Sequence, residues 1–180
     1  MANVTPKGKS GWSQLREARG FKGAEENKKF SQDLVLPKDV GEKFVAQLQE
    51  EANKLHAQEL EKAKMRGKNV RYAPPMINYK DLPDGSLQLS FKRKEEDGPP
   101  LVIDAHKKPY TGIVGREHSL EIAYEMKPYV LATVFGVTLK LIAVRVLEVG
   151  ATVESVSDLF ADTPASAAPS KAKTEIDDLF

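Results

Sequence analysis

The last seven residues of this 180-residue chain combine two kinds of chemistry. They bring acids together with an apolar pair next to the terminal carboxylate: Glu175, Asp177, Asp178, Leu179 and Phe180. Carboxylates pair with lysine and arginine, whereas leucine and phenylalanine fill apolar pockets. These residue types favour docking on a basic surface that also has an apolar pocket.

The near-neutral total charge hides a split along the chain. There are 27 Lys and Arg residues against 26 Asp and Glu residues, and the formal net charge is +1. Residues 151–180 hold two of the bases and six of the acids, so they carry −4 while residues 1–150 carry +5. This pattern is expected of a cationic body that binds a polyanion, with an acidic tail that competes for the body or recruits another protein.

Composition predicts one soluble domain with extensions. Hydrophobic residues make up 41% of the chain, which is enough for one core. The chain has no cysteine, which excludes a disulfide framework and thiolate metal sites. Lys140 and Arg145 interrupt the longest apolar stretch, and residues 1–7 lack the apolar run of a signal peptide. We therefore expect a cytoplasmic protein with no membrane partner.

The most regular pattern predicts a helix over about residues 39–66. Apolar residues recur at spacings of four and three, which places them on one helix face: Val40, Phe44, Leu48, Ala52 and Leu55. Asp39 followed by Glu42 is typical of a capping box, and Gly67 is typical of a helix stop.

Short strands account for most of the remaining sequence between residues 11 and 150. We expect them at residues 11–15, 30–36, 76–82, 86–92, 101–105, 119–127, 130–135 and 137–149. Pro83-Asp84-Gly85 predicts a hairpin turn, and Gly136 predicts a kink or bulge in the closing ribbon. Short strands with one inserted helix favour a mainly β architecture, a small closed or partly open barrel.

The segments outside this domain have little with which to build a core. Residues 1–10 predict a flexible basic arm, and residues 151–173 predict a disordered linker rich in Pro, Ala and Ser. Residues 174–180 then form an acidic tail for protein interaction. The predicted organisation is therefore an arm, a domain over residues 11–150, a linker and a tail.

Four features together carry a family resemblance. They are the acidic tail that ends in Phe180 behind the linker, the early strand Gly11-Trp12-Ser13, the run from Phe30 to Lys38 into a helix, and the closing strand with Gly136 to Leu141 followed by Ala143-Val144. With them the chain resembles the single-stranded DNA-binding proteins of tailed phages, over most of its length from about residue 11.

The resemblance implies an OB-fold, which is a Greek-key β-barrel, with an inserted helix and sequence-independent binding of single-stranded DNA. It implies coating and protection of DNA in phage replication, recombination and repair, in the cytoplasm of an infected bacterial cell, with no catalytic residue and no cofactor. It also implies a tail that competes with DNA and docks replication and recombination proteins such as a polymerase, a helicase or a nuclease.

Such a protein needs cations along the phosphates and flat side chains under the bases. The sequence interleaves these types repeatedly, and the candidate DNA-binding residues are Lys7, Lys9, Trp12, Lys22, Lys29, Phe30, Arg71, Tyr72, Tyr79, Lys80, Lys92, Arg93, Lys94, Lys107, Lys108, Tyr110 and Arg116. Trp12 is either a core residue or a stacking platform. Phe44, Phe91 and Tyr124 share faces with aliphatic residues and are expected in the core.

Two alternative functions are compatible with the sequence. One uses other residues, and the other uses the same cations and aromatic residues. Asp104 followed by Glu125 and Lys127 imitates the carboxylate and lysine set of a metal-dependent nuclease. An RNA-binding OB protein would use the same platforms, because stacking accepts both nucleic acids. The three histidines have no metal-ligand spacing, so we expect no metal. A homodimer through the helix or a sheet edge stays open.

Overall fold

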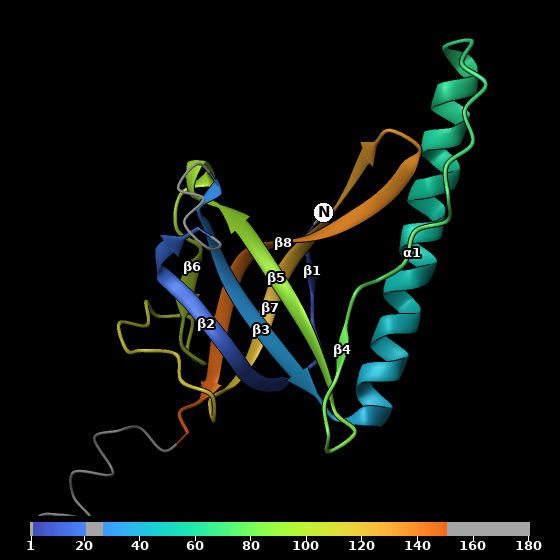
Figure 1. Cartoon of the computed structure of the whole chain (residues 1–180). Coiled ribbons are helices and arrows are strands. Elements are labelled where there is room, and N and C mark those ends of the chain that lie inside the picture. The colour runs from blue at the N-terminus through green and yellow to red at the C-terminus, as the bar shows by residue number, and fades with distance from the viewer. Residues whose placement is uncertain (1, 21–26, 151–180) are drawn as a thin grey trace, which may run out of the picture. The chain divides into compact units, whose positions relative to one another are not determined.

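The computed structural model describes residues 2–20 and 27–150 (Figure 1). Its elements in chain order are β1 (Asn3–Val4), β2 (Gly8–Arg19), β3 (Lys29–Leu36), α1 (Lys38–Met65), β4 (Lys80–Asp81), β5 (Leu87–Lys94), the 3-10 turn η2 (Glu95–Asp97), β6 (Leu101–Ile103), β7 (Ser119–Leu131) and β8 (Val134–Glu148). The predicted linker and the acidic tail lie outside the described residues.

Five of the strands close into a barrel. β3 lies between β2 and β5 with antiparallel pairing on both sides. β5 meets β8 in parallel where Lys92 lies opposite Lys140, and β8 pairs antiparallel with β7. β7 returns to β2 where Leu120 lies opposite Gly8, which completes the ring. The mainly β Greek-key barrel with one inserted helix, as in an OB-fold, is therefore confirmed.

Alternating residues of the barrel strands build the core. Leu87, Leu89 and Phe91 of β5 are buried, as their spacing of two predicts for one face of a strand. The Phe91 ring lies 5.4 Å from that of Tyr124 on β7, and Tyr124 is also buried. The predicted core placement of Phe44, Phe91 and Tyr124 is confirmed.

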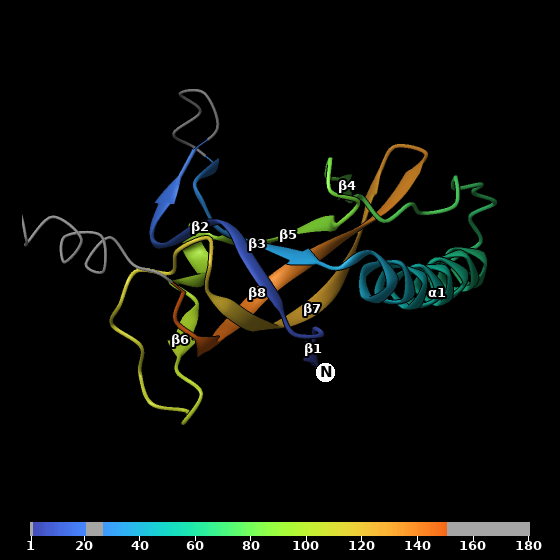
Figure 2. The same cartoon turned by 90° about the horizontal axis from the view of Figure 1, so that it is seen from below.

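Helix α1 lies against one side of the barrel, and β6 lies on the opposite side (Figures 1 and 2). Phe44, Leu48 and Ala52 of α1 are buried in the core, and Phe44 meets Tyr124 edge to face with ring centroids 6.0 Å apart. Figure 1 shows the second half of α1 extending beyond the barrel, with the following segment running back beside it. Within the described residues, no helix is long and apolar enough to cross a membrane.

The ends of α1 match the prediction in part. Gly67 follows the helix at φ +71° and its N–H donates to the carbonyl oxygen of Lys64, as expected for a glycine stop. The predicted capping box is wrong, because the extended residue Pro37 takes the N-cap position and no side chain caps the helix. Asp39 instead lies in the first turn, where its charge is favourable to the helix dipole.

The segment predicted as a flexible basic arm is part of the sheet, so that prediction is wrong. β1 pairs antiparallel with β7, and β2 begins at Gly8. Between them the Thr5 N–H donates to the carbonyl oxygen of Ile122 at 2.9 Å, and the Ile122 N–H donates to Thr5 Oγ1 at 3.0 Å. The edge of β7 satisfies these backbone groups and thereby orders residues 3–5.

The ribbon of β7 and β8 also differs from the prediction. Residues 130–135, expected as one strand, contain the hairpin turn, with Ala132 at φ 53° between the two strands. Gly136 is neither a kink nor a bulge, since it pairs in register with Tyr129. A Cβ at this position would collide with the Tyr129 ring, which explains the glycine.

Candidate nucleic-acid interface

The outer face of β3 and β5 is polar and carries lysines. Lys29, Ser31 and Asp33 alternate along β3 with residues that face the core. Lys92 of β5 lies opposite Ser31, and Ser90 lies opposite Asp33. Two adjacent strands therefore present cations and small polar side chains outward from the same surface, over a closed apolar core.

A bulge in β2 places Trp12 beside this face. Ser10 is opposite Leu34 and Ser13 is opposite Gln32, so β2 has one extra residue between these pairs. A bulge of this kind redirects a side chain, and Trp12 is 53% exposed. At the neighbouring Gly11, a Cβ would lie 2.9 Å from the Cβ of Asp33, so a larger residue would disturb the close approach.

Two clefts, of about 380 and 440 Å³, follow this outer surface and share Lys29 and Lys92. The smaller one continues past Gln14 and Ser31 to Trp12, and the larger one passes Gln88 and Ser90 to Tyr79 and Tyr129. We define the cationic face as the charged and aromatic residues that line these two clefts: Trp12, Arg19, Lys29, Tyr79, Lys80, Lys92 and Tyr129. Cations thus lie between aromatic side chains on both sides.

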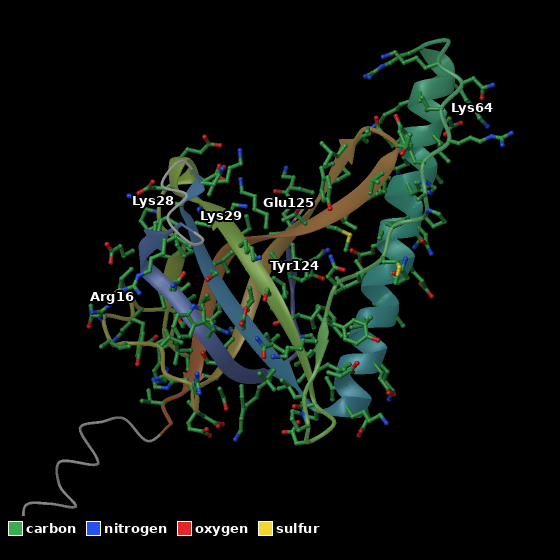
Figure 3. The ribbon with its side chains drawn as sticks, viewed as in Figure 1. Arg16, Lys28, Lys29, Lys64, Tyr124 and Glu125 are labelled. Carbon is green, nitrogen blue, oxygen red and sulfur yellow. The ribbon has the colours of Figure 1, made fainter. Side chains whose placement is uncertain are left out.

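The two lysines that both clefts share are available to an anion. Among the described residues, Lys29 and Lys92 form no ion pair. The carboxylate of Asp33, which is buried on the same strand face, accepts hydrogen bonds from Gln88 at 2.5 Å and Ser90 at 2.6 Å. Figure 3 shows Lys28 and Lys29 close together near the start of β3. Unpaired cations on a shared concave surface attract phosphates.

Tyr129 is a candidate platform that sequence reasoning missed. Tyr79 and Tyr129 are each 47% exposed, and both line the larger cleft. The Tyr129 ring lies over Gly136 of the neighbouring strand, because that glycine has no side chain to displace it. The segment Lys127-Pro128-Tyr129 could have predicted it, because a cation and an aromatic residue lie close together there at the exposed end of a strand. Arg19 was missed as well.

Several predicted cations are held by other groups. Lys7 pairs with Glu148 at 2.7 Å, and Lys9 pairs with Glu117 at 3.1 Å. The Lys7 ammonium lowers the pKa of the Glu148 carboxyl below its usual value. These lysines line a different cleft, between β2 and the start of α1, and not the cationic face.

At the end of β5, two further predicted cations are engaged locally. Arg93 donates to the carbonyl oxygens of Gly98, at 2.7 Å, and Asp97, so it holds the turn after β5. Lys94 pairs with Glu96 at 2.8 Å. Arg93 therefore positions the turn that includes η2, and its side chain is only partly accessible.

The structure places most of the other predicted DNA-binding residues away from the cationic face. Phe30 as a stacking residue is wrong, because it is 5% exposed on the same strand face as Leu34 and Leu36. The other positions stay predictions away from the cationic face: Arg71 and Tyr72 on the segment beside α1, and Lys107, Lys108 and Arg116 on the loop before β7. Lys22 lies outside the described residues. Tyr110 is half-buried in that same loop and lines another cleft beside Trp12.

The nuclease residues do not form a site. Asp104 Oδ1 accepts the N–H groups of His106 and Lys108, each at 2.8 Å, so it shapes its own turn. Glu125 pairs with Lys127 at 2.7 Å. Strand register places Ile103 opposite Arg145 and Glu125 opposite Lys140, about 16 Å apart along β8 at roughly 3.3 Å per residue. Over the described ranges, no group of three or more potential metal ligands comes together.

A buried histidine fixes the loop before β7. His118 is 1% exposed, and its Nε2 lies 3.1 Å from the Tyr110 hydroxyl. Its Nδ1 has no hydrogen-bond partner among the described residues. Burial lowers the pKa of His118 below its ordinary value of about 6.5, because the charged ring would lose its hydration.

The free energy of unfolding should therefore depend on pH through His118. The unfolded chain binds this proton below about pH 6.5 and the folded chain does not until lower pH, so stability falls as the pH falls through that window. We expect His118→Gln to remove this part of the dependence, which has a slope of at most about 1.4 kcal/mol per pH unit. Urea unfolding of both proteins at pH 7.5 and 5.5 measures it. The same pH dependence in both would contradict the assignment.

The closed barrel with a helix between β3 and β5 is a fold shared with two solved phage proteins. The structure is similar to gp2.5, the single-stranded DNA-binding protein encoded by bacteriophage T7, with a TM-score of 0.67, 17% identity, and coverage of 92% of this chain and 98% of that one. The single-stranded DNA-binding protein of bacteriophage Enc34, in complex with single-stranded DNA, gives a TM-score of 0.57 at 15% identity, covering 83% of this chain and 86% of that one. No family model and no curated protein sequence matches the chain.

Proposed function

We propose that this protein binds single-stranded DNA without base preference, through the cationic face. The observation that carries the proposal is the sharing of Lys29 and Lys92 by two clefts, with Trp12 on one side and Tyr79 and Tyr129 on the other. Lysines bind phosphates, and aromatic rings stack on any base. The shared fold with two phage single-stranded DNA-binding proteins supports the same assignment.

The exposed aromatic side chains favour single strands over duplexes. A flat ring can stack only on a base whose face is free, whereas a duplex hides the faces of its bases in the stack. The test is a competition experiment by gel mobility, with labelled (dT)30 bound to the full chain and challenged by unlabelled single strand or duplex. We expect single strands of any composition to compete and duplex to compete weakly. Equal competition by duplex would contradict the proposal.

The proposed role is to coat and protect exposed strands during phage replication, recombination and repair, without catalysis, in the cytoplasm of the infected cell. The support for this role is the resemblance of the sequence to tailed-phage proteins, together with a site that has cations and aromatics. Incubation of the full chain with single-stranded DNA and magnesium should leave the DNA intact. Cleavage that is removed by Asp104→Asn would favour the nuclease function instead.

The acidic tail is proposed to recruit other replication and recombination proteins. Asp177, Asp178 and the terminal carboxylate suit a basic surface, and Leu179 and Phe180 suit an apolar pocket. We predict that deletion of residues 174–180 leaves the affinity for single-stranded DNA unchanged or raises it, because a competing polyanion is removed. The same deletion should abolish capture of a replication polymerase or helicase from the cognate host.

Two measurements check the tail prediction: oligonucleotide anisotropy and partner pull-down, each with the full and the shortened chain. A matched control replaces Asp158, an acid that also lies in residues 151–180 but outside the tail, with asparagine. A large loss of DNA affinity on deletion of the tail would overturn the assigned role.

A further inference from the structure

A further cleft, of about 400 Å³, lies on the other side of Trp12. We call it the loop cleft, and its main lining residues are Trp12, Leu15, Arg16, Tyr110, Ile113 and Val114. It arises because β2 bows outward: Gln14 pairs with Ser31 but Arg19 pairs with Lys29, so β2 has extra residues between these pairs. Trp12 lines both this cleft and the smaller cleft of the cationic face.

The loop before β7, with Tyr110, Ile113 and Val114, forms the outer wall of the loop cleft. Contacts within the protein fix its conformation before any ligand binds. The Arg16 guanidinium donates to the carbonyl oxygen of Thr111, which ties the loop to β2. Figure 3 shows Arg16 on the outer side of β2, beside this loop. Tyr110 is fixed by its contact with the buried His118, and a Cβ at Gly112 would collide with the Tyr110 ring. A preformed wall lowers the cost of ordering on binding.

The loop cleft combines an apolar wall with positive charge. Ile113 lines the cleft and is 73% exposed. Most of this aliphatic side chain is therefore not covered by other described residues. Arg16 uses one of its N–H donors on Thr111, and a guanidinium has five. Glu17 also lines the cleft, and it lies 3.9 Å from Arg19 in an exposed ion pair.

We propose that the loop cleft binds the nucleotide that follows those on the cationic face, within the same single strand. The base lies between Ile113 and Trp12, and the phosphate lies at Arg16. The two clefts are continuous through Trp12, Arg16 supplies positive charge for a phosphate, and the volume is within the range that holds small ligands. This inference rests on the proposed function and extends its binding site around Trp12.

The test uses the full chain and a ladder of oligothymidylates of increasing length. Ile113→Glu puts a carboxylate in the loop cleft, and Met65→Glu is the matched control, because Met65 is 81% exposed at the end of α1. We expect Ile113→Glu to bind the shortest oligomers like the wild type and to bind longer ones at least about fivefold more weakly, since one stacked base is lost. Met65→Glu should follow the wild type at every length.

The binding data distinguish a failure of the loop-cleft proposal from a failure of the proposed function. If the wild type binds single strands and Ile113→Glu matches Met65→Glu at every length, the loop cleft is not part of the site, while the proposed function stands. If the wild type binds no single-stranded DNA, both fail.

A second variant, Arg16→Gln, removes the charge but keeps a donor for Thr111. It should reduce the slope of log affinity against log salt by about 0.7 with long oligomers. An unchanged slope would contradict the placement of a phosphate at Arg16.

Discussion

We expect replacement of Trp12 with alanine to lower the affinity for single-stranded DNA by about 5-fold to 150-fold, which corresponds to roughly 1–3 kcal/mol for the loss of one stacking platform. Trp12 is 53% exposed and lines the clefts on both sides of it, so its removal takes a ring from the middle of the proposed path. Anisotropy of a labelled oligothymidylate measures the affinity of both proteins under the same salt conditions.

Two further variants separate stacking from a general loss of structure. Trp12→Phe keeps an aromatic ring and should retain most of the affinity. Met65→Ala removes another exposed apolar side chain, from the far end of α1, and should have no effect. Thermal unfolding checks that all three variants stay folded. An alanine variant that is folded and binds like the wild type would exclude Trp12 from the site.

We expect the second large effect when Lys29 and Lys92 are both replaced by glutamine. Each lysine that contacts a phosphate of a single strand contributes about 0.7 to the slope of log affinity against log salt, so the double variant should lose about 1.4. Both residues line the two clefts of the cationic face, and neither has an ion pair among the described residues. Titrations at several salt concentrations give the slopes directly.

The chain offers a matched control for this experiment. Lys7 and Lys9 are also exposed lysines of one region, but they pair with Glu148 and Glu117. The double variant Lys7→Gln and Lys9→Gln removes the same charge and should leave the slope nearly unchanged. If this control lowers the slope and the variant of Lys29 and Lys92 does not, DNA binds near the start of β2 and not on the cationic face.

Local patterns predicted the elements whose residues repeat regularly. The alternation of Leu87, Leu89 and Phe91 predicted a strand with one buried face, and the spacing of Phe44 and Leu48 predicted the buried face of α1. These predictions held because burial of an apolar face decides such segments. The start of α1 was missed by one residue, since Pro37 takes the N-cap position expected for a polar side chain.

Contacts between residues far apart in the chain, and the pairing of strands, explain the site predictions that were wrong or incomplete. Lys7 looked like part of a free basic arm, but its partner Glu148 is 141 residues away and is brought near by the closure of the barrel. Tyr129 becomes an exposed platform only because β8 places Gly136 opposite it. Phe30 lies next to lysines in sequence, yet strand alternation turns its side chain inward. Residues that are close in sequence therefore predicted which types of side chain form the candidate site, but not which individual residues form it.

The most direct test of the cationic face is the intrinsic fluorescence of Trp12, the only tryptophan of the chain. The full chain is titrated with poly(dT) and with an equivalent duplex, at low and high salt. We predict quenching by the single strand alone, with an affinity that falls as salt rises. Binding of poly(dT) in a gel mobility assay without any change in the fluorescence of Trp12 would place the DNA elsewhere and contradict the proposed site.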